Sequence, residues 1–69
     1  MTVDELRVHL NNLINKYVTD EPARQRLLKL VEREDIPAKG ILVELTPFTS
    51  GLVSEEDRRL IGEIAFYYC

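Results

Sequence analysis

Residues 54–69, SEEDRRLIGEIAFYYC, carry the clearest helix start in the chain and its densest apolar and aromatic content. The Ser54 hydroxyl can accept a hydrogen bond from a free backbone N–H of the first turn, and the three carboxylates that follow lie at the positive end of the helix dipole. The side chain of Asp57 can reach back to the Ser54 N–H, as in a capping box. The sequence therefore predicts a helix over residues 54–68, against which the rest of the chain folds.

Most apolar side chains of this helix fall on one broad arc at about 100° per residue. They are Leu60, Ile61, Ile64, Ala65, Tyr67 and Tyr68. Phe66 lies on the opposite side with Arg59 and Gly62. A helix whose last two turns are apolar nearly all round must be covered on more than one side. Either a loop of the same chain covers Phe66, or another molecule does.

Two further helices are predicted before this one. Thr2 and Glu5 have the spacing of a capping box, and apolar residues then recur at intervals of three and four over residues 3–18. Asp20 can cap a second helix over residues 21–34, and the proline in its first turn loses no hydrogen bond. The link between these two helices is so short that we expect them to pack as an antiparallel hairpin.

Residues 35–47, DIPAKGILVELTP, fit two different structures. As a helix over residues 36–45, the segment is capped by Asp35 and stopped by Thr46-Pro47. As a strand over residues 40–45, it needs a partner, and pairing it with residues 64–69 would contradict the helix start at Ser54. The helix is therefore the preferred prediction. The segment that follows, 48–52, is predicted to be a loop in which Phe48 and Leu52 fold back over the core.

Length and composition indicate a single globular domain. Sixty-nine residues with 45% hydrophobic and 30% charged side chains are typical of one small globular domain and not of a disordered chain. Together with the helices predicted above, this gives the predicted fold class: a mostly α fold, a small bundle of three or four short helices, in a single domain over residues 1–69.

Several functional classes lack the residues that they need. Cys69 is the only cysteine and His9 the only histidine, which excludes a disulfide within the chain and a four-thiolate zinc site. No apolar run approaches the ~20 residues of a membrane span, and residues 1–20 contain no signal-peptide core. No phosphate-binding glycine loop, nucleophile elbow or metalloprotease motif is present. We expect a cytoplasmic protein that is not an enzyme and binds no membrane, metal or cofactor.

Apolar side chains beyond what one small core can cover indicate a protein-binding surface. Aromatic residues near a helix end are good anchors because they bury a large area at low entropic cost. We expect a small non-enzymatic binding module that is regulatory, inhibitor-like or antitoxin-like, or an assembly subunit, and that self-associates as a twofold homodimer. The predicted anchors are Phe66, Tyr67, Tyr68, Leu42 and Phe48.

A basic row on the second helix suggests the alternative function. The row consists of Arg26, Lys29 and Arg33, which are spaced to line one flank of the helix. These side chains can either bind nucleic-acid phosphates or pair with neighbouring carboxylates. The second and third helices with their turn are similar to a helix-turn-helix, but residues 38–44 offer one cation and no Asn, Gln or Arg to read bases. A net charge of −3 does not favour nucleic acid either. Nucleic-acid binding would therefore depend on the basic row.

Overall fold

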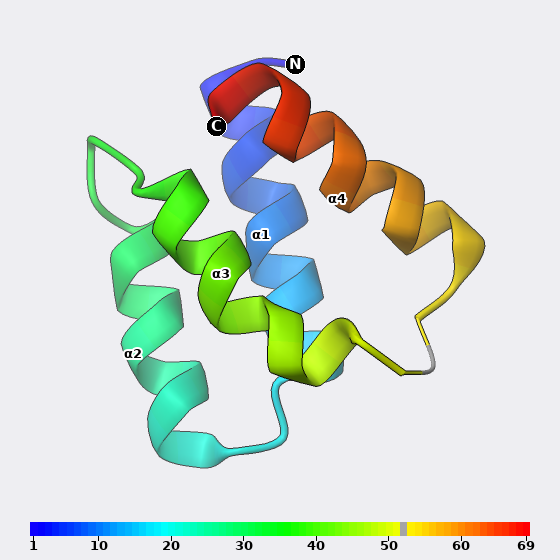
Figure 1. Cartoon of the computed structure of the whole chain (residues 1–69). Coiled ribbons are helices and arrows are strands. Elements are labelled where there is room, and N and C mark those ends of the chain that lie inside the picture. The colour runs from blue at the N-terminus through cyan, green and yellow to red at the C-terminus, as the bar shows by residue number, and fades with distance from the viewer. Residues whose placement is uncertain (52) are drawn as a thin grey trace.

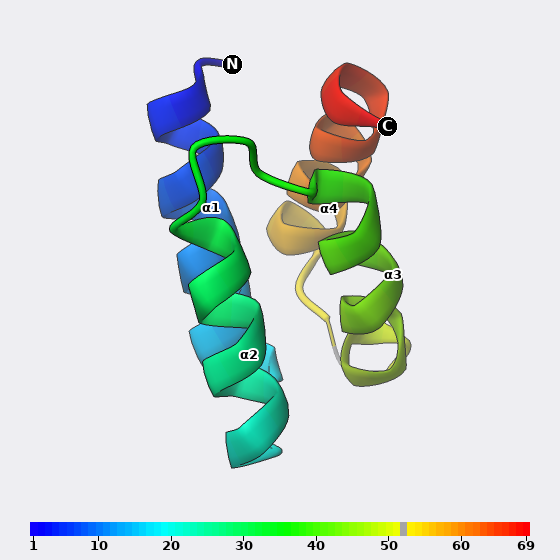
Figure 2. The ribbon, with the colours of Figure 1, turned by 90° about the vertical axis from the view of Figure 1, so that its left-hand side faces the viewer.

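The computed structural model describes residues 1–51 and 53–69, about three quarters of them helical. Its helices are α1 (Val3–Tyr17), α2 (Glu21–Val31), α3 (Ala38–Thr49) and α4 (Glu55–Tyr68). Figures 1 and 2 show two antiparallel hairpins, α1 with α2 and α3 with α4, stacked as two layers. The predicted bundle of short helices and the α1–α2 hairpin are confirmed. Leu52, predicted to fold back over the core, lies outside the described residues.

The predicted helix starts at three of the four helices are confirmed. The hydroxyl oxygen of Thr2 accepts a hydrogen bond of 3.1 Å from the N–H of Glu5. The Glu5 carboxylate in turn accepts a hydrogen bond from the Thr2 N–H, which completes the capping box. Asp20 and Ser54 accept bonds of 3.1 and 3.2 Å from the third residue of α2 and of α4. Each cap satisfies one of the N–H groups that a helix start leaves without a partner. Short polar signals in the sequence therefore determine where these helices begin.

The core surrounds α1, and not α4 as the sequence suggested. α1 packs against each of the other three helices and contributes four fully buried side chains, whereas α4 contributes only Ile64 among the described residues. The prediction that the chain folds against residues 54–69 is wrong in this respect. The core consists of Leu6, Leu10, Leu13, Ile14, Val18, Leu27, Val31, Ala38, Ile41, Leu45 and Ile64.

Residues 40–45 are helical, so the strand alternative is wrong. α3 also departs from the predicted helix over residues 36–45 at both ends. Its N-cap is Pro37, without a side-chain cap, so Asp35 does not cap it. It continues through Pro47 to Thr49, which places Phe48 in the helix and not in a loop.

Burial and solvation explain why Pro47 does not stop α3. Ile41, Leu45 and Phe48 recur at intervals of four and three on the side that packs into the core, so one more turn buries more apolar surface. Pro47 lies on the exposed side, where water can satisfy the carbonyl that its missing N–H leaves free. In the same turns the hydroxyls of Thr46 and Thr49 donate bonds of 3.0 and 3.2 Å to carbonyls one turn back.

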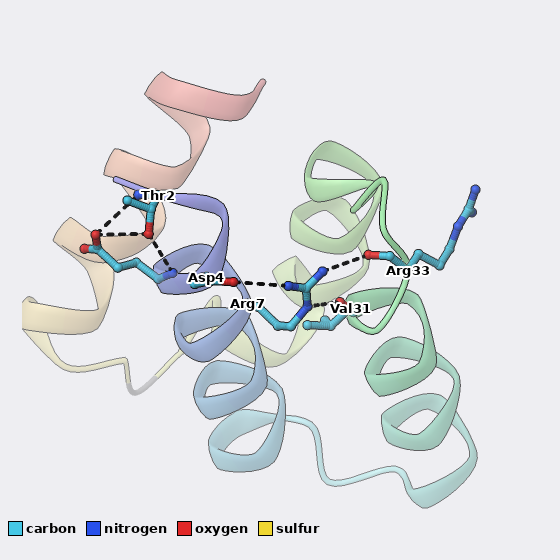
Figure 3. Close-up of polar contacts among 6 residues, drawn as sticks. Thr2, Asp4, Arg7, Val31 and Arg33 are labelled. Atoms are coloured by element: carbon cyan, nitrogen blue, oxygen red, sulfur yellow. Dashed lines mark hydrogen bonds and ion pairs between the residues drawn. The ribbon is translucent and has the colours of Figure 1, made fainter.

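α2 ends at Val31, three residues before the predicted end, and a side chain from α1 lies at that point. Arg7 donates from Nε to the carbonyl of Val31 at 3.1 Å and from Nη2 to that of Arg33 at 3.0 Å (Figure 3). A cation is favourable at the negative end of a helix dipole, and it satisfies carbonyls that the helix itself leaves free. Residues 32–37 then cross to the second layer (Figure 2).

We expect Arg7→Met to lower the free energy of unfolding by about 1–3 kcal/mol, because two carbonyls lose a charged donor while the aliphatic stem is kept. Urea unfolding followed by circular dichroism measures the loss. Arg58→Met, which removes an exposed arginine of α4, is the control and should change stability by less than about 0.5 kcal/mol. Equal effects of the two substitutions would contradict a special role for Arg7.

Candidate functional site

The first turn of α4 is fastened to the last turn of α1 by a polar cluster. The ammonium of Lys16 donates to Oδ2 of Asp57 at 2.7 Å, and the hydroxyl of Tyr17 donates to the same oxygen. The Ser54 N–H donates to the Tyr17 oxygen at 3.3 Å. Asp57 therefore does not reach back to the Ser54 N–H as predicted, because Tyr17 binds both groups.

The cluster changes the acid–base behaviour of Asp57 and Lys16. Hydrogen bonds from Lys16 and then from Tyr17 lower the pKa of Asp57 to about 2, since both favour the carboxylate. The hydrogen bond to Asp57 raises the pKa of Lys16. Only 18% of the Asp57 side chain is exposed, so the pair is partly shielded from solvent. The hydrogen bonds from Lys16 and Tyr17 to Asp57 hold the first turn of α4 against the last turn of α1.

The last turn of α4 is also bound to the N-terminal residue that precedes α1. The hydroxyl of Tyr68 donates to the carbonyl of Met1 at 2.9 Å, and the ring packs at the edge of the core. Figures 1 and 2 show the two termini at the same end of the molecule. Both ends of α4 are thus attached through its inner face, which carries Asp57, Leu60, Ile61, Ile64 and Tyr68.

The opposite side of α4 is exposed to solvent. We define the α4 outer face as Arg59, Gly62, Phe66 and Cys69, which are all exposed. Phe66 is the most exposed large apolar residue in the described part of the chain, at 81%, so no described loop covers it. The neighbouring Tyr67 is 59% exposed, and the rings meet edge to face with centroids 5.1 Å apart. The prediction that a loop of the same chain covers Phe66 is therefore wrong.

The buried arc of α4 is narrower than the sequence suggested. Ala65 and Tyr67 were expected on it, but both are exposed. The helices that α4 packs against most closely are α1 and α3. Its flanks remain in solvent. Among apolar residues of the helix, Ile64 is fully buried and the half-buried ones are Leu60, Ile61 and Tyr68.

The structure separates the five predicted anchors. Phe66 and Tyr67 lie together on the surface, whereas Tyr68 turns inward to the N-terminus. Leu42 and Phe48, both on α3, are half-buried and pack against the core. Helical periodicity already placed Phe66 on the outer side of α4. It could not show that Leu42 and Phe48 pack against the core of the same chain.

The basic row does not form one continuous surface on α2. Arg26 is paired with Glu44 of α3, which matches the expectation that neighbouring carboxylates take up these cations. Lys29 is exposed on α2. Arg33 lies beyond the end of the helix; its carbonyl accepts from Arg7, and its side chain points away from Arg7 (Figure 3).

One hollow on the surface lies along α1. It has a volume of about 330 Å³ and is lined by Asp4, Glu5, Val8 and His9. All four residues come from one helix, so functional groups do not converge there from different elements as they do in binding pockets. Within residues 1–51 and 53–69, no group of three or more acidic, His or Cys side chains could hold a metal ion.

Comparisons with protein-family models, with curated proteins and with solved structures find no match for this chain. None of the described helices is long and apolar enough to span a membrane. Function is therefore inferred from the geometry of the α4 outer face.

We expect Asp57→Asn to lower the free energy of unfolding at pH 7 by about 1–2 kcal/mol. The folded pKa of Asp57, about 2, lies below the unfolded value of 3.8. The carboxylate therefore stabilises the fold fully above about pH 4 and progressively less as the pH falls toward 2.

Urea unfolding at pH 7, 4, 3 and 2 tests this pH dependence. The wild-type chain should lose more stability than the variant as the pH falls from 4 to 2. Glu55→Gln is the control. Glu55 lies in the same turn of α4, and its side chain is 84% exposed. This variant should retain the wild-type pH dependence of stability. A variant and a wild type with parallel pH profiles would show that the Asp57 cluster does not stabilise the fold.

Proposed function

We propose that the protein is a non-enzymatic protein-binding module that binds through the aromatic end of the α4 outer face. The single observation that supports this function is the exposure of Phe66, 81%, on a helix that is held from its other side. When a partner covers a large exposed aromatic ring, the apolar area removed from water is larger than for any other exposed group of this helix, and so is the gain in binding free energy. The contact with Tyr67 also limits the motion of the ring, which lowers the entropic cost of binding.

The shape of the site favours a protein over a small molecule. The outer face is the convex side of one helix, so it offers nothing that encloses a small ligand. A protein can cover it with a groove or with another helix. Regulation, inhibition as in an antitoxin, and assembly all require no more than such binding, and we propose that the protein acts in one of these ways in the cytoplasm.

Nucleic-acid binding receives less support. Lys29 and Arg26 are both exposed on α2, which favours it, but Arg26 is paired with Glu44 and Arg33 lies off the helix. Binding that depends on these residues would weaken steeply with salt.

Photo-crosslinking in extracts of the cells that make the protein tests the proposed function. A photoreactive phenylalanine at position 66 should form a discrete adduct with protein, because this ring is the predicted anchor. The same group at position 25, an exposed site on α2, is the control. Excess wild-type chain should compete for the adduct, and excess Phe66→Ala chain should not. No adduct specific to position 66 would disprove the proposal.

We expect Phe66→Ala to abolish partner binding while the helix content and the free energy of unfolding stay within about 0.5 kcal/mol of wild type. Ile64→Ala is the matched control, since Ile64 is fully buried on the opposite side of the same helix. It should destabilise the chain by about 2–4 kcal/mol. Circular dichroism with urea unfolding separates the two effects. Unfolding of the Phe66 variant would place this residue in the core instead.

A further inference from the structure

Gly62 lies in the middle of α4, and nothing in the described part of the chain requires a glycine there. Its φ is not positive, and beyond its neighbours and the backbone of its own helix an added Cβ would meet no described atom within 4 Å. Glycine is nonetheless the least favourable residue after proline in a helix interior. On the outer face it leaves a notch in the helix surface, one turn before the exposed ring of Phe66.

We propose, resting on the proposed function above, that a second copy of this chain occupies the α4 outer face, with the two α4 helices antiparallel about a twofold axis between Gly62 and Phe66. Each Phe66 ring then fills the notch over Gly62 of the other copy. Arg59, Gly62, Phe66 and Cys69 are spaced three, four and three residues apart, which is the spacing of a helix pair.

Charge selects the antiparallel arrangement. A parallel pair would place Arg59 against Arg59 of the other copy and Glu55 against its own equivalent, and like charges repel. In the antiparallel pair, Arg59 lies beside the last turn of the other α4. That turn contains no basic residue of its own, and its carbonyls form the negative end of the helix dipole. The side chain of Arg59 is 77% exposed, and its contact with Glu55 is long, 3.8 Å, so it is available for this interaction.

The size of the contact sets the strength of the dimer. One face of a 14-residue helix buries less than the roughly 1,200 Å² that separates stable from weak protein interfaces. The dimer is therefore reversible and concentration-dependent, and it is disrupted by changes to single residues at its centre.

Gly62→Ala is the decisive variant. A methyl group at this position fits the monomer, so we expect the midpoint of thermal unfolding to rise at low concentration, where the chain is monomeric. The same methyl group fills the notch, so the dissociation constant should increase at least tenfold. Sedimentation equilibrium measures association for wild type, Gly62→Ala, Phe66→Ala and the control Val8→Ala, whose residue is exposed on α1. Association unchanged by Gly62→Ala would overturn the arrangement.

Disulfide trapping tests the direction of the helices. In the antiparallel pair, position 59 lies beside Cys69 of the other copy, whereas the two Cys69 residues are about 15 Å apart along the helix axis. Under diamide as oxidant, Arg59→Cys should form covalent dimers rapidly and wild type should not. Residues 59 and 69 of one chain are also about 15 Å apart on the helix, so the bond must join two chains. Rapid dimer formation by wild type through Cys69 would overturn the antiparallel pair.

Failure of this inference and failure of the proposed function are distinguishable. A wild-type chain that stays at 8.0 kDa at millimolar concentration overturns the dimer. If position 66 still forms an adduct with a different protein, the proposed function stands while the dimer does not. Absence of any adduct at position 66 removes the proposed function as well.

Discussion

Burial of one apolar stripe on α1 is the constraint on which the rest of the structure depends. A chain of 69 residues is close to the lower size limit for folding without a disulfide or metal. A small number of buried side chains must therefore provide most of the stability of the fold. Leu6, Leu10, Leu13 and Ile14 are fully buried because the other three helices all pack against α1. The flanks of the same helix provide Arg7 and Tyr17, which bind the end of α2 and the start of α4. One helix thus holds both the core and the polar contacts that orient its neighbours.

Helix starts were predictable because they are local. The hydroxyl or carboxylate at Thr2, Asp20 or Ser54 needs only an N–H group three residues away, and that spacing can be read from the sequence. Helix ends depended on distant residues. α2 ends where Arg7, 24 residues away from Val31, binds its carbonyl. α3 passes Pro47 because burial of the stripe that includes Phe48 outweighs the missing hydrogen bond.

At the candidate site, too, local features were predictable from the sequence and features that depend on distant residues were not. Periodicity alone placed Phe66 opposite the buried arc of α4, and the structure confirms its outward position. The width of that arc depends on which helices pack closely against α4. These are α1 and α3, and Tyr67 lies in solvent against expectation. Asp57 illustrates the same limit: its role at the helix start was visible, but its partners Lys16 and Tyr17 are 41 and 40 residues away.

The contacts that hold α4 in the fold and the surface proposed to bind a partner lie on opposite sides of the helix. The inner face is fastened at both ends, through Asp57 and Tyr68, but Ile64 is its only fully buried side chain among the described residues. The other apolar contacts of α4 with the core come from the half-buried residues Leu60, Ile61 and Tyr68. A ligand that binds only the docked helix stabilises it by mass action. Covering Phe66 from outside would shift the equilibrium toward docked α4 even though the covering molecule touches no core residue. The proposed binding through the outer face would thus be coupled to the docking of α4, since both involve the same helix.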